Sequence, residues 1–139
     1  MTQNTDCRRS FCPINFVLEI FGDKWSLLIV RDLMFKGKRT YGEFLASDEK
    51  IATNILADRL KRLESKGIIQ KVTDPHQPTK GGYGLTQMGK DLLPIMLEIT
   101  AWSSKYDPLT NTPTWFVNNP EAGKTRLSEM ILAQWQSEP

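Results

Sequence analysis

Two stretches decide the fold of this chain: RTYGEFL at residues 39–45 and IATNILADRLKRLESKG at residues 51–67. In the first stretch, Thr40 and Glu43 have the spacing of a capping box, which predicts a helix of one to two turns. In the second, apolar residues recur at helical intervals until Gly67, which predicts a longer helix that ends there. Two helices joined by a short polar turn have the organisation of a helix-turn-helix.

The second helix, from about Ile51 to Lys66, has two chemically different faces. At about 100° per residue, its leucines at 56, 60 and 63 fall with Ala52 within an arc of about 80°, which we expect to be buried. Small and polar side chains form the opposite face, as a helix that enters a DNA groove requires. These residues are Thr53, Asn54, Ala57, Asp58, Lys61 and Ser65.

A β-hairpin is predicted directly after this helix. Residues 68–73 are rich in β-branched side chains and predict a strand. Residues 74–82 hold two prolines and two glycines, which predicts a loop, and residues 83–85 are the expected return strand. A hairpin in this position is the wing of a winged helix-turn-helix.

Further helices are expected on both sides of this motif. Before it, Pro13 suits the start of a helix to Phe21, and Asp23 can cap a helix to about Phe35. After the hairpin, one long helix is expected, with a kink at Pro94 because proline lacks an amide proton. The expected ranges are 86–106 for the long helix, 107–119 for a connector and 120–136 for a last helix.

Length and composition indicate one globular domain. The chain has 139 residues, of which 40% are hydrophobic and 24% charged, and these values exclude a mostly disordered chain. No apolar run approaches the ~20 residues of a membrane span and no signal-peptide pattern begins the chain, so a cytoplasmic protein without a membrane partner is expected. Residues 36–80 hold ten basic and six acidic side chains, against eight and ten elsewhere. A phosphate-facing surface requires such a local excess, and an ordinary solvated surface can also have one.

Short motifs in a fixed order carry a family resemblance. They are CP at 12–13, GDKW at 22–25, RTYGEF at 39–44, ILADRLKRLE at 55–64 and YGLTQMG at 83–89. The ordered set over about residues 7–106 resembles the HxlR-type winged-helix regulators, relatives of the MarR-like group. The resemblance implies a mainly α fold with a small β-hairpin (α+β), which dimerises through its N- and C-terminal helices. It also implies a bacterial transcription regulator, either a repressor or an activator.

The resemblance also suggests a division of the chain. Residues 1–106 would be the DNA-binding and dimerisation domain, and residues 107–139 a C-terminal extension that is not an independent domain. Ala52 departs from the family, whose members often have there a serine hydroxyl that can cap the helix or touch phosphate. The hairpin tip departs as well, because it is not strongly basic.

The predicted partner is double-stranded DNA, and the second motif helix would read it. Asn54 is the best candidate for base reading, because an amide can bond an adenine edge in two places, and Thr53 lies beside it near the helix start. Ala57 leaves room for close approach or for a thymine methyl group. Lys61 can meet a base or a phosphate.

Two charged residues of the same helix have alternative roles. Asp58 either reads cytosine or pairs with Arg62, and the ion pair is favoured because a carboxylate repels phosphate. Arg59 lies nearer the apolar face and brings its guanidinium either to a phosphate or to an acidic neighbour. Other phosphate contacts are predicted before the first motif helix and on the wing. They are Lys38, Arg39, Thr40, Lys71, His76, Gln77 and Lys80.

The two cysteines, Cys7 and Cys12, lack the spacing and the nearby histidines of a zinc site, so neither a metal nor another cofactor is expected. Some HxlR-type regulators sense oxidants or electrophiles through an N-terminal cysteine, and Cys12 matches the family's Cys-Pro position. Arg8 and Arg9, with a helix start beside Cys12, can lower the thiol pKa. The alternatives are therefore a sensor for an oxidant or small-molecule effector, and two inert thiols in a reducing compartment.

The favoured hypothesis is a sequence-specific transcription regulator that binds an inverted-repeat operator as a homodimer. An enzyme is not expected, because His76 is the only histidine and no carboxylate pair occupies a defined motif. A thiol oxidoreductase that uses Cys7 and Cys12 is the enzymatic alternative, and turnover of a disulfide or a peroxide would reveal it. A winged helix used only for protein contacts is the other alternative, and it would have no salt-dependent affinity for duplex DNA.

Overall fold

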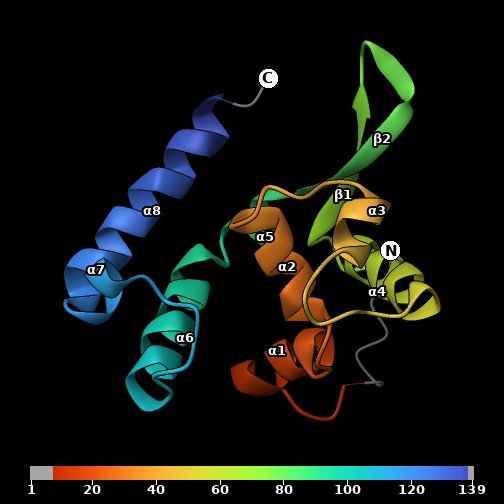
Figure 1. Ribbon diagram of the computed structural model, residues 1–139. Helices are drawn as coiled ribbons and strands as arrows, with labels where there is room; N and C mark the ends of the chain where they lie inside the picture. The colour runs from red at the N-terminus through yellow and green to blue at the C-terminus, as the bar shows by residue number, and fades with distance from the viewer. Residues whose placement is uncertain (1–7, 138–139) are drawn as a thin grey trace. The chain divides into compact units, whose positions relative to one another are not determined.

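The structure is a computed structural model that describes residues 8–137, except for the side chains of residues 77–80. Its contacts divide the chain into two compact units, which meet in sequence between Thr86 and Gln87. Figure 1 labels the elements in chain order. They are α1 (Pro13–Phe21), α2 (Ser26–Met34), α3 (Tyr41–Leu45), α4 (Thr53–Ser65), β1 (Ile69–Asp74), β2 (Gln77–Leu85), α5 (Gln87–Lys90), α6 (Leu93–Tyr106), α7 (Thr114–Val117) and α8 (Pro120–Ser137).

The N-terminal unit contains the predicted helix-turn-helix. The capping box is confirmed: the Thr40 side chain accepts from the Glu43 amide, and the Glu43 carboxylate accepts from the Thr40 amide. Helix α4 is confirmed as well, and it ends before Gly67, whose φ of 81° lies in the left-handed region that favours glycine. The mainly helical fold with one two-stranded antiparallel hairpin agrees with the winged helix-turn-helix prediction.

The core of this unit forms where α2, α3 and α4 meet. Leu56, Leu60 and Leu63 of α4 are at most 1% exposed, and burial of each leucine stabilises the fold by about 1.5–3 kcal/mol. Val30 of α2 and Phe44 of α3 are buried with comparable completeness. Ala52 does not join them as predicted, because it is the exposed N-cap residue of α4 and lies before the first helical turn.

The hairpin is longer than the sequence predicted. Strands β1 and β2 pair with Ile69 opposite Leu85 and Lys71 opposite Tyr83, and the chain reverses at Pro75 and His76. The prediction of a loop over residues 74–82 is therefore wrong, because the return strand begins at residue 77. Each strand of a two-stranded hairpin has an outer edge, where proline and glycine are tolerated. In Figure 1 the hairpin extends away from α3 and α4.

One main-chain hydrogen bond joins the hairpin to the segment before α3. The Tyr83 amide donates to the carbonyl oxygen of Arg39 over 2.8 Å. A Cβ atom at position 82 would lie 2.5 Å from that same oxygen, a distance that real Cβ atoms essentially never show. Gly82 is thus required for this close approach.

The predicted long helix over residues 86–106 is two helices. Helix α5 ends at Lys90 and α6 begins at Leu93, so the helix is interrupted where the sequence predicts a kink. Pro94 is the second residue of α6, where its missing amide proton costs no helical hydrogen bond. The break is favoured because a proline inside one continuous helix would clash with the preceding turn.

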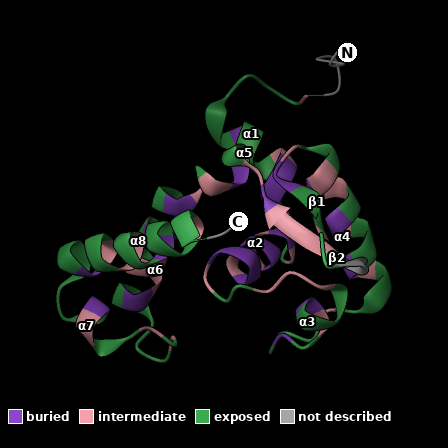
Figure 2. Ribbon diagram, turned by 90° about the horizontal axis from the view of Figure 1, so that it is seen from above, coloured by how far each residue is buried: buried purple, intermediate pink, exposed green. Residues whose placement is uncertain are grey.

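In the C-terminal unit, α6, α7 and α8 pack against one another. Phe116 of α7 is fully buried, and Gly123 of α8 lies so close that a Cβ atom there would meet the Phe116 ring at 2.8 Å. Helix α7 falls in the predicted connector, whereas α8 matches the predicted last helix. Most of α8 is exposed, as the green ribbon in Figure 2 shows. None of the described helices is long and apolar enough to cross a membrane.

Candidate nucleic-acid interface

The outward face of α4 has the composition and exposure that the sequence predicted. Its small and polar residues are all exposed, on the side of the helix away from the buried leucines. An α-helix of this width fits the major groove of DNA, and its first residues reach the base edges in helix-turn-helix proteins. The exposed set is Thr53, Asn54, Ala57, Asp58, Lys61 and Ser65.

Tyr41 fixes the start of α4, a role that the sequence analysis missed. Its hydroxyl group donates to the main-chain oxygen of Thr53 over 2.6 Å, so α3 and the first residue of α4 are directly linked. Because Tyr41 is the first residue of α3 and twelve residues from Thr53, helical periodicity gives no signal for this bond. The tyrosine therefore supports the start of α4, where the exposed set begins.

The amides at the start of α3 are occupied by a carboxylate. Glu43 accepts hydrogen bonds from the amides of Thr40 at 3.0 Å and Arg39 at 3.2 Å, and these bonds hold its pKa below the ordinary value. The Thr40 hydroxyl also bonds within this capping box. A phosphate predicted to bind at this helix start would have to compete with the Glu43 carboxylate.

Lys38 lies in a polar cluster that the sequence did not indicate. Its ammonium donates to the Ser47 hydroxyl over 2.9 Å and lies 4.0 Å from the Asp32 carboxylate, which is only 3% exposed. Ser47 in turn donates to Asp32. Arg31 pairs with Asp32 and also with Glu49, so this cluster ties the turn between α3 and α4 to α2.

The predicted ion pair between Asp58 and Arg62 is wrong. Asp58 pairs instead with its neighbour Arg59, while Arg62 donates to the main-chain oxygen of Glu19. Arg59 also donates from Nε to the Asp23 carboxylate over 2.9 Å, so an acidic neighbour is its partner in this structure. Burial of the two arginine stems along the flank of α4 favours such intramolecular partners.

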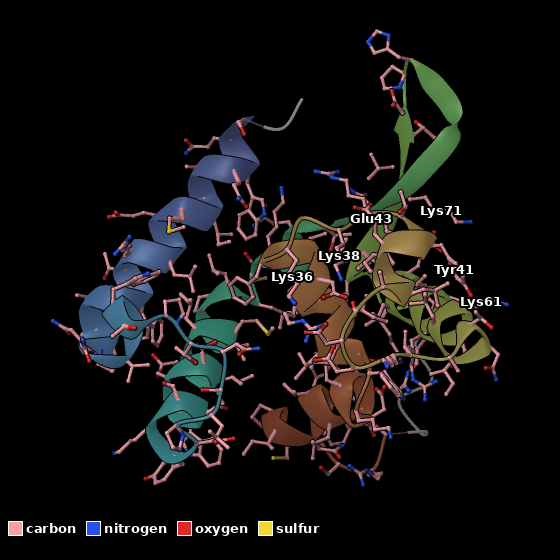
Figure 3. All side chains as sticks on the ribbon, viewed as in Figure 1. Lys36, Lys38, Tyr41, Glu43, Lys61 and Lys71 are labelled. Carbon is pink, nitrogen blue, oxygen red and sulfur yellow. The ribbon has the colours of Figure 1, made fainter. Side chains whose placement is uncertain are left out.

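The wing has two described side chains of the predicted set. Lys71 of β1 is exposed, and Figure 3 shows Lys71 and Lys61 extending outward from the ribbon. His76 is exposed in the turn, where its amide donates to Asp74 over 2.8 Å. The predicted wing residues Gln77 and Lys80 have side chains that lie outside the described part of the structure.

Cys12 is an exposed free thiol at the N-cap of α1. Its pKa is lowered by the main-chain amides of Asn15 and Ile14, which favour the thiolate. The helix start is thus the cause, whereas the predicted contribution of the arginines is not seen: Arg9 donates to the Asn15 side chain. Arg8 lies over the Phe11 ring. Cys7 lies outside the described residues.

The helix-turn-helix followed by the β-hairpin defines a winged helix-turn-helix protein. The family model of the HxlR-like helix-turn-helix matches residues 20–111, and the chain therefore belongs to that family. Curated relatives from Synechocystis and Bacillus subtilis are named transcriptional regulators of the helix-turn-helix type.

Relatives and solved structures agree with this membership. The helix-turn-helix-type transcriptional regulator sll1512 of Synechocystis is 37% identical over 86 residues, which are 62% of this chain and 63% of that protein. This chain therefore spans less than two thirds of that relative. The structure of PA1607, a candidate transcription factor, matches with a TM-score of 0.67 and 35% identity over 78% of this chain and 76% of PA1607.

A third comparison concerns a regulator with known redox forms. The reduced form of the transcriptional regulator YodB from B. subtilis matches with a TM-score of 0.58 and 28% identity, over 70% of this chain and 95% of YodB. YodB has also been solved after diamide treatment and with a bound quinone.

Proposed function

We propose that this protein binds a specific operator in duplex DNA as a homodimer, with the exposed face of α4 in the major groove, and that it represses transcription. The observation that carries the proposal is the separation of the two faces of α4. Its leucines are buried while all its small and polar groove-side residues are exposed. Such a surface can approach base edges without first unfolding any part of the unit.

The proposed roles follow from position and chemistry. Asn54 and Thr53, in the first turn of α4, read base edges, and Ala57 allows close approach to the groove floor. Lys61 contacts a base or a phosphate, and Asp58 borders the same groove. Phosphate contacts from the wing and the segment before α3 position the protein along the duplex. We assign them to Lys71, His76, Gln77 and Lys80 and to Lys38, Arg39 and Thr40.

A homodimer is proposed because α1 and α6 each expose large apolar side chains. Several exposed apolar side chains recur at helical spacing on each helix, and such groups mark interaction surfaces. They are Ile14, Val17 and Leu18 of α1 and Ile95, Ile99 and Trp102 of α6. A two-fold dimer would present two copies of α4 to one duplex and would require an inverted-repeat site. The exposed apolar side chains would be covered by the second copy.

The test is selection of bound fragments from random duplex DNA, with the selected sequence then used in titrations. We expect a recovered motif with inverted symmetry, and an affinity that falls steeply with salt as phosphates release counterions. Lys71→Ala should reduce the slope of log affinity against log salt by about 0.9 without changing the motif. Recovery of no duplex above background would contradict the proposal and favour a module for protein contacts.

We further propose that Cys12 makes DNA binding responsive to oxidants or electrophiles. The support is its exposed thiol of lowered pKa and the similarity to YodB, which has been solved in diamide-treated and quinone-bound forms. Wild-type protein should lose its operator after treatment with diamide or a quinone, and Cys12→Ser should retain it. The matched variant Cys7→Ser separates the contributions of the two thiols. A Cys12→Ser protein that still loses DNA would exclude this sensor.

A further inference from the structure

Two arginines lie on the same flank of α4, between its buried stripe and its exposed face. At about 100° per residue, Arg59 and Arg62 are about 60° apart around the helix. Neither lies on the face of the helix that carries Asn54 and Lys61. Both are half-buried, unlike the exposed residues of the proposed DNA face. Their positions suggest a task different from direct contact with DNA.

Arg59 joins α4 to Asp23, which accepts hydrogen bonds from the residues at the start of α2. Asp23 accepts from Arg59 Nε at 2.9 Å, and its two oxygens also accept from the Trp25 amide at 3.0 Å and from the Ser26 amide and hydroxyl at 3.1 and 2.7 Å. Burial raises the pKa of Asp23, but hydrogen bonds from Ser26, Trp25 and Arg59 outweigh it and lower the pKa to about 2. The carboxylate is therefore charged and held in one orientation.

Arg62 makes the second connection, to α1. Its Nη2 donates to the main-chain oxygen of Glu19, which lies in the last turn of α1. A cation is favourable at that end because the helix dipole places partial negative charge there. Through Arg59 and Arg62, α4 is thus attached to the end of α1 and to Asp23 in the corner that precedes α2.

The buried leucines alone do not fix the rotation of α4 about its axis. Apolar packing is not directional, whereas base reading requires side chains to be placed within about 0.5 Å and 10–20°. Hydrogen bonds from a planar guanidinium are directional and can supply that restraint. The same bonds reduce the value of Arg59 as a phosphate ligand, because it already faces the carboxylates of Asp23 and Asp58.

We propose that Arg59 and Arg62 are positioning residues, which orient the DNA-reading face of α4 by holding the helix to the corner between α1 and α2, and that Arg59 acts through Asp23 and does not touch DNA. The inference rests on the proposed DNA binding through α4. If the inference holds, loss of Asp23 and loss of Arg59 lower operator affinity through the same bond. A direct contact with phosphate could not explain such an effect of Asp23, because a carboxylate repels phosphate.

The test uses the selected operator and four variants of the full chain: Arg59→Ala, Arg59→Lys, Asp23→Asn and the double variant Asp23→Asn/Arg59→Ala. Asparagine keeps an oxygen that can accept from the Trp25 and Ser26 amides, so Asp23→Asn can retain these bonds. Lys61→Ala is the matched control, since it removes a positive charge from the exposed face of the same helix. Circular dichroism verifies that each variant is folded, and affinity is measured across a range of salt concentrations.

Each single variant at positions 23 and 59 should lose about tenfold in affinity with an unchanged salt slope, and the double variant should lose no more than either single one. Arg59→Lys should also lose affinity, because one ammonium cannot hold two carboxylates as a guanidinium does. Lys61→Ala should instead lower the slope by about 0.9. Arg62→Ala should behave like Arg59→Ala.

The inference is overturned if Arg59→Ala lowers the salt slope as Lys61→Ala does, if Arg59→Lys binds like wild type, or if the losses at positions 23 and 59 add. Unchanged affinity in both Asp23→Asn and Arg59→Ala would overturn it as well. Failure of the wild-type protein to bind any duplex is a separate result. It would contradict the proposed DNA binding, and the positioning role of Arg59 and Arg62 with it.

Discussion

Asn54 is the residue whose side chain has the most specific predicted task. Replacement by alanine should weaken binding by about 1–3 kcal/mol at one base position and relax the preference there, because the two amide hydrogen bonds to an adenine edge are lost. The measurement is a set of titrations with operators substituted at every position. Ser65→Ala, at the far end of the same exposed face, is the control and should leave the preference intact. Equal loss at every base position would exclude Asn54 from base reading.

Asp23 gives the protein a predictable response to acid. Its pKa of about 2 in the folded chain lies below the ordinary 3.8, so the charged form stabilises the fold above about pH 4. That contribution is lost as pH falls from about 4 through 2, where the carboxylate takes up a proton. The hydrogen bond from Arg31 lowers the pKa of Glu49 to about 2, so the stabilising contribution of this carboxylate is lost over a similar pH range.

The acid response is measured by urea unfolding of wild type and Asp23→Asn between pH 7 and pH 2. The variant should be less stable at neutral pH, and the difference should shrink below pH 4. Glu49 contributes equally to both proteins, so the difference isolates Asp23. A difference that stays constant down to pH 2 would contradict the assigned pKa.

The residues of the interface could be predicted from the sequence only where the signal is local. The exposed set on α4 follows from helical periodicity, and the capping box follows from a spacing of three residues. Arg59 and Asp23 are 36 residues apart, and Arg62 reaches a main-chain oxygen 43 residues away. Such partners depend on how the helices pack, so a spacing of four residues predicts Arg62 as the partner of Asp58, whereas the structure pairs Asp58 with Arg59.

Two glycines should respond in opposite ways to the same substitution. Gly82→Ala would place a Cβ atom 2.5 Å from the Arg39 oxygen and should destabilise the fold by about 1–3 kcal/mol. Gly42 lies in α3 with nothing within 4 Å of such an atom, so Gly42→Ala should stabilise by about 0.5–1 kcal/mol through reduced chain entropy. Urea midpoints measure both changes. Loss of stability of the same size in both variants would show that the close approach at Gly82 is unimportant.

Helices with clear start and stop signals could be predicted, and the others could not. Pro13, Gly67 and Pro120 mark ends that the structure confirms. The sequence predicts a kink near Pro94, where the structure has two separate helices, α5 and α6. Proline disturbs a helix, but its presence does not show whether the helix bends or is interrupted. The sequence predicts too short a return strand, because proline and glycine usually indicate a loop. The outer edge of a hairpin strand accepts both residues.

The proposed homodimer determines the spacing of the two half-sites in its operator. Two copies of α4 related by a two-fold axis read half-sites about 34–36 Å apart, which is one turn of DNA. Insertion of five base pairs between the half-sites should abolish tight binding, because the second half-site is turned to the opposite side of the duplex. Sedimentation should give a dimer both free and on the operator. Equal affinity for the lengthened operator, or a monomer on DNA, would contradict the two-fold arrangement.

The bond from the Tyr83 amide to the Arg39 carbonyl has a consequence for how this protein can diverge. Both atoms belong to the peptide backbone, so replacing either side chain leaves the bond available. Mutation can therefore change the charge and length of the side chains along the hairpin, and adapt them to a different phosphate path, while the hairpin stays attached at this point. That freedom requires that position 82 remain glycine and that position 83 not become proline, which has no amide proton to donate.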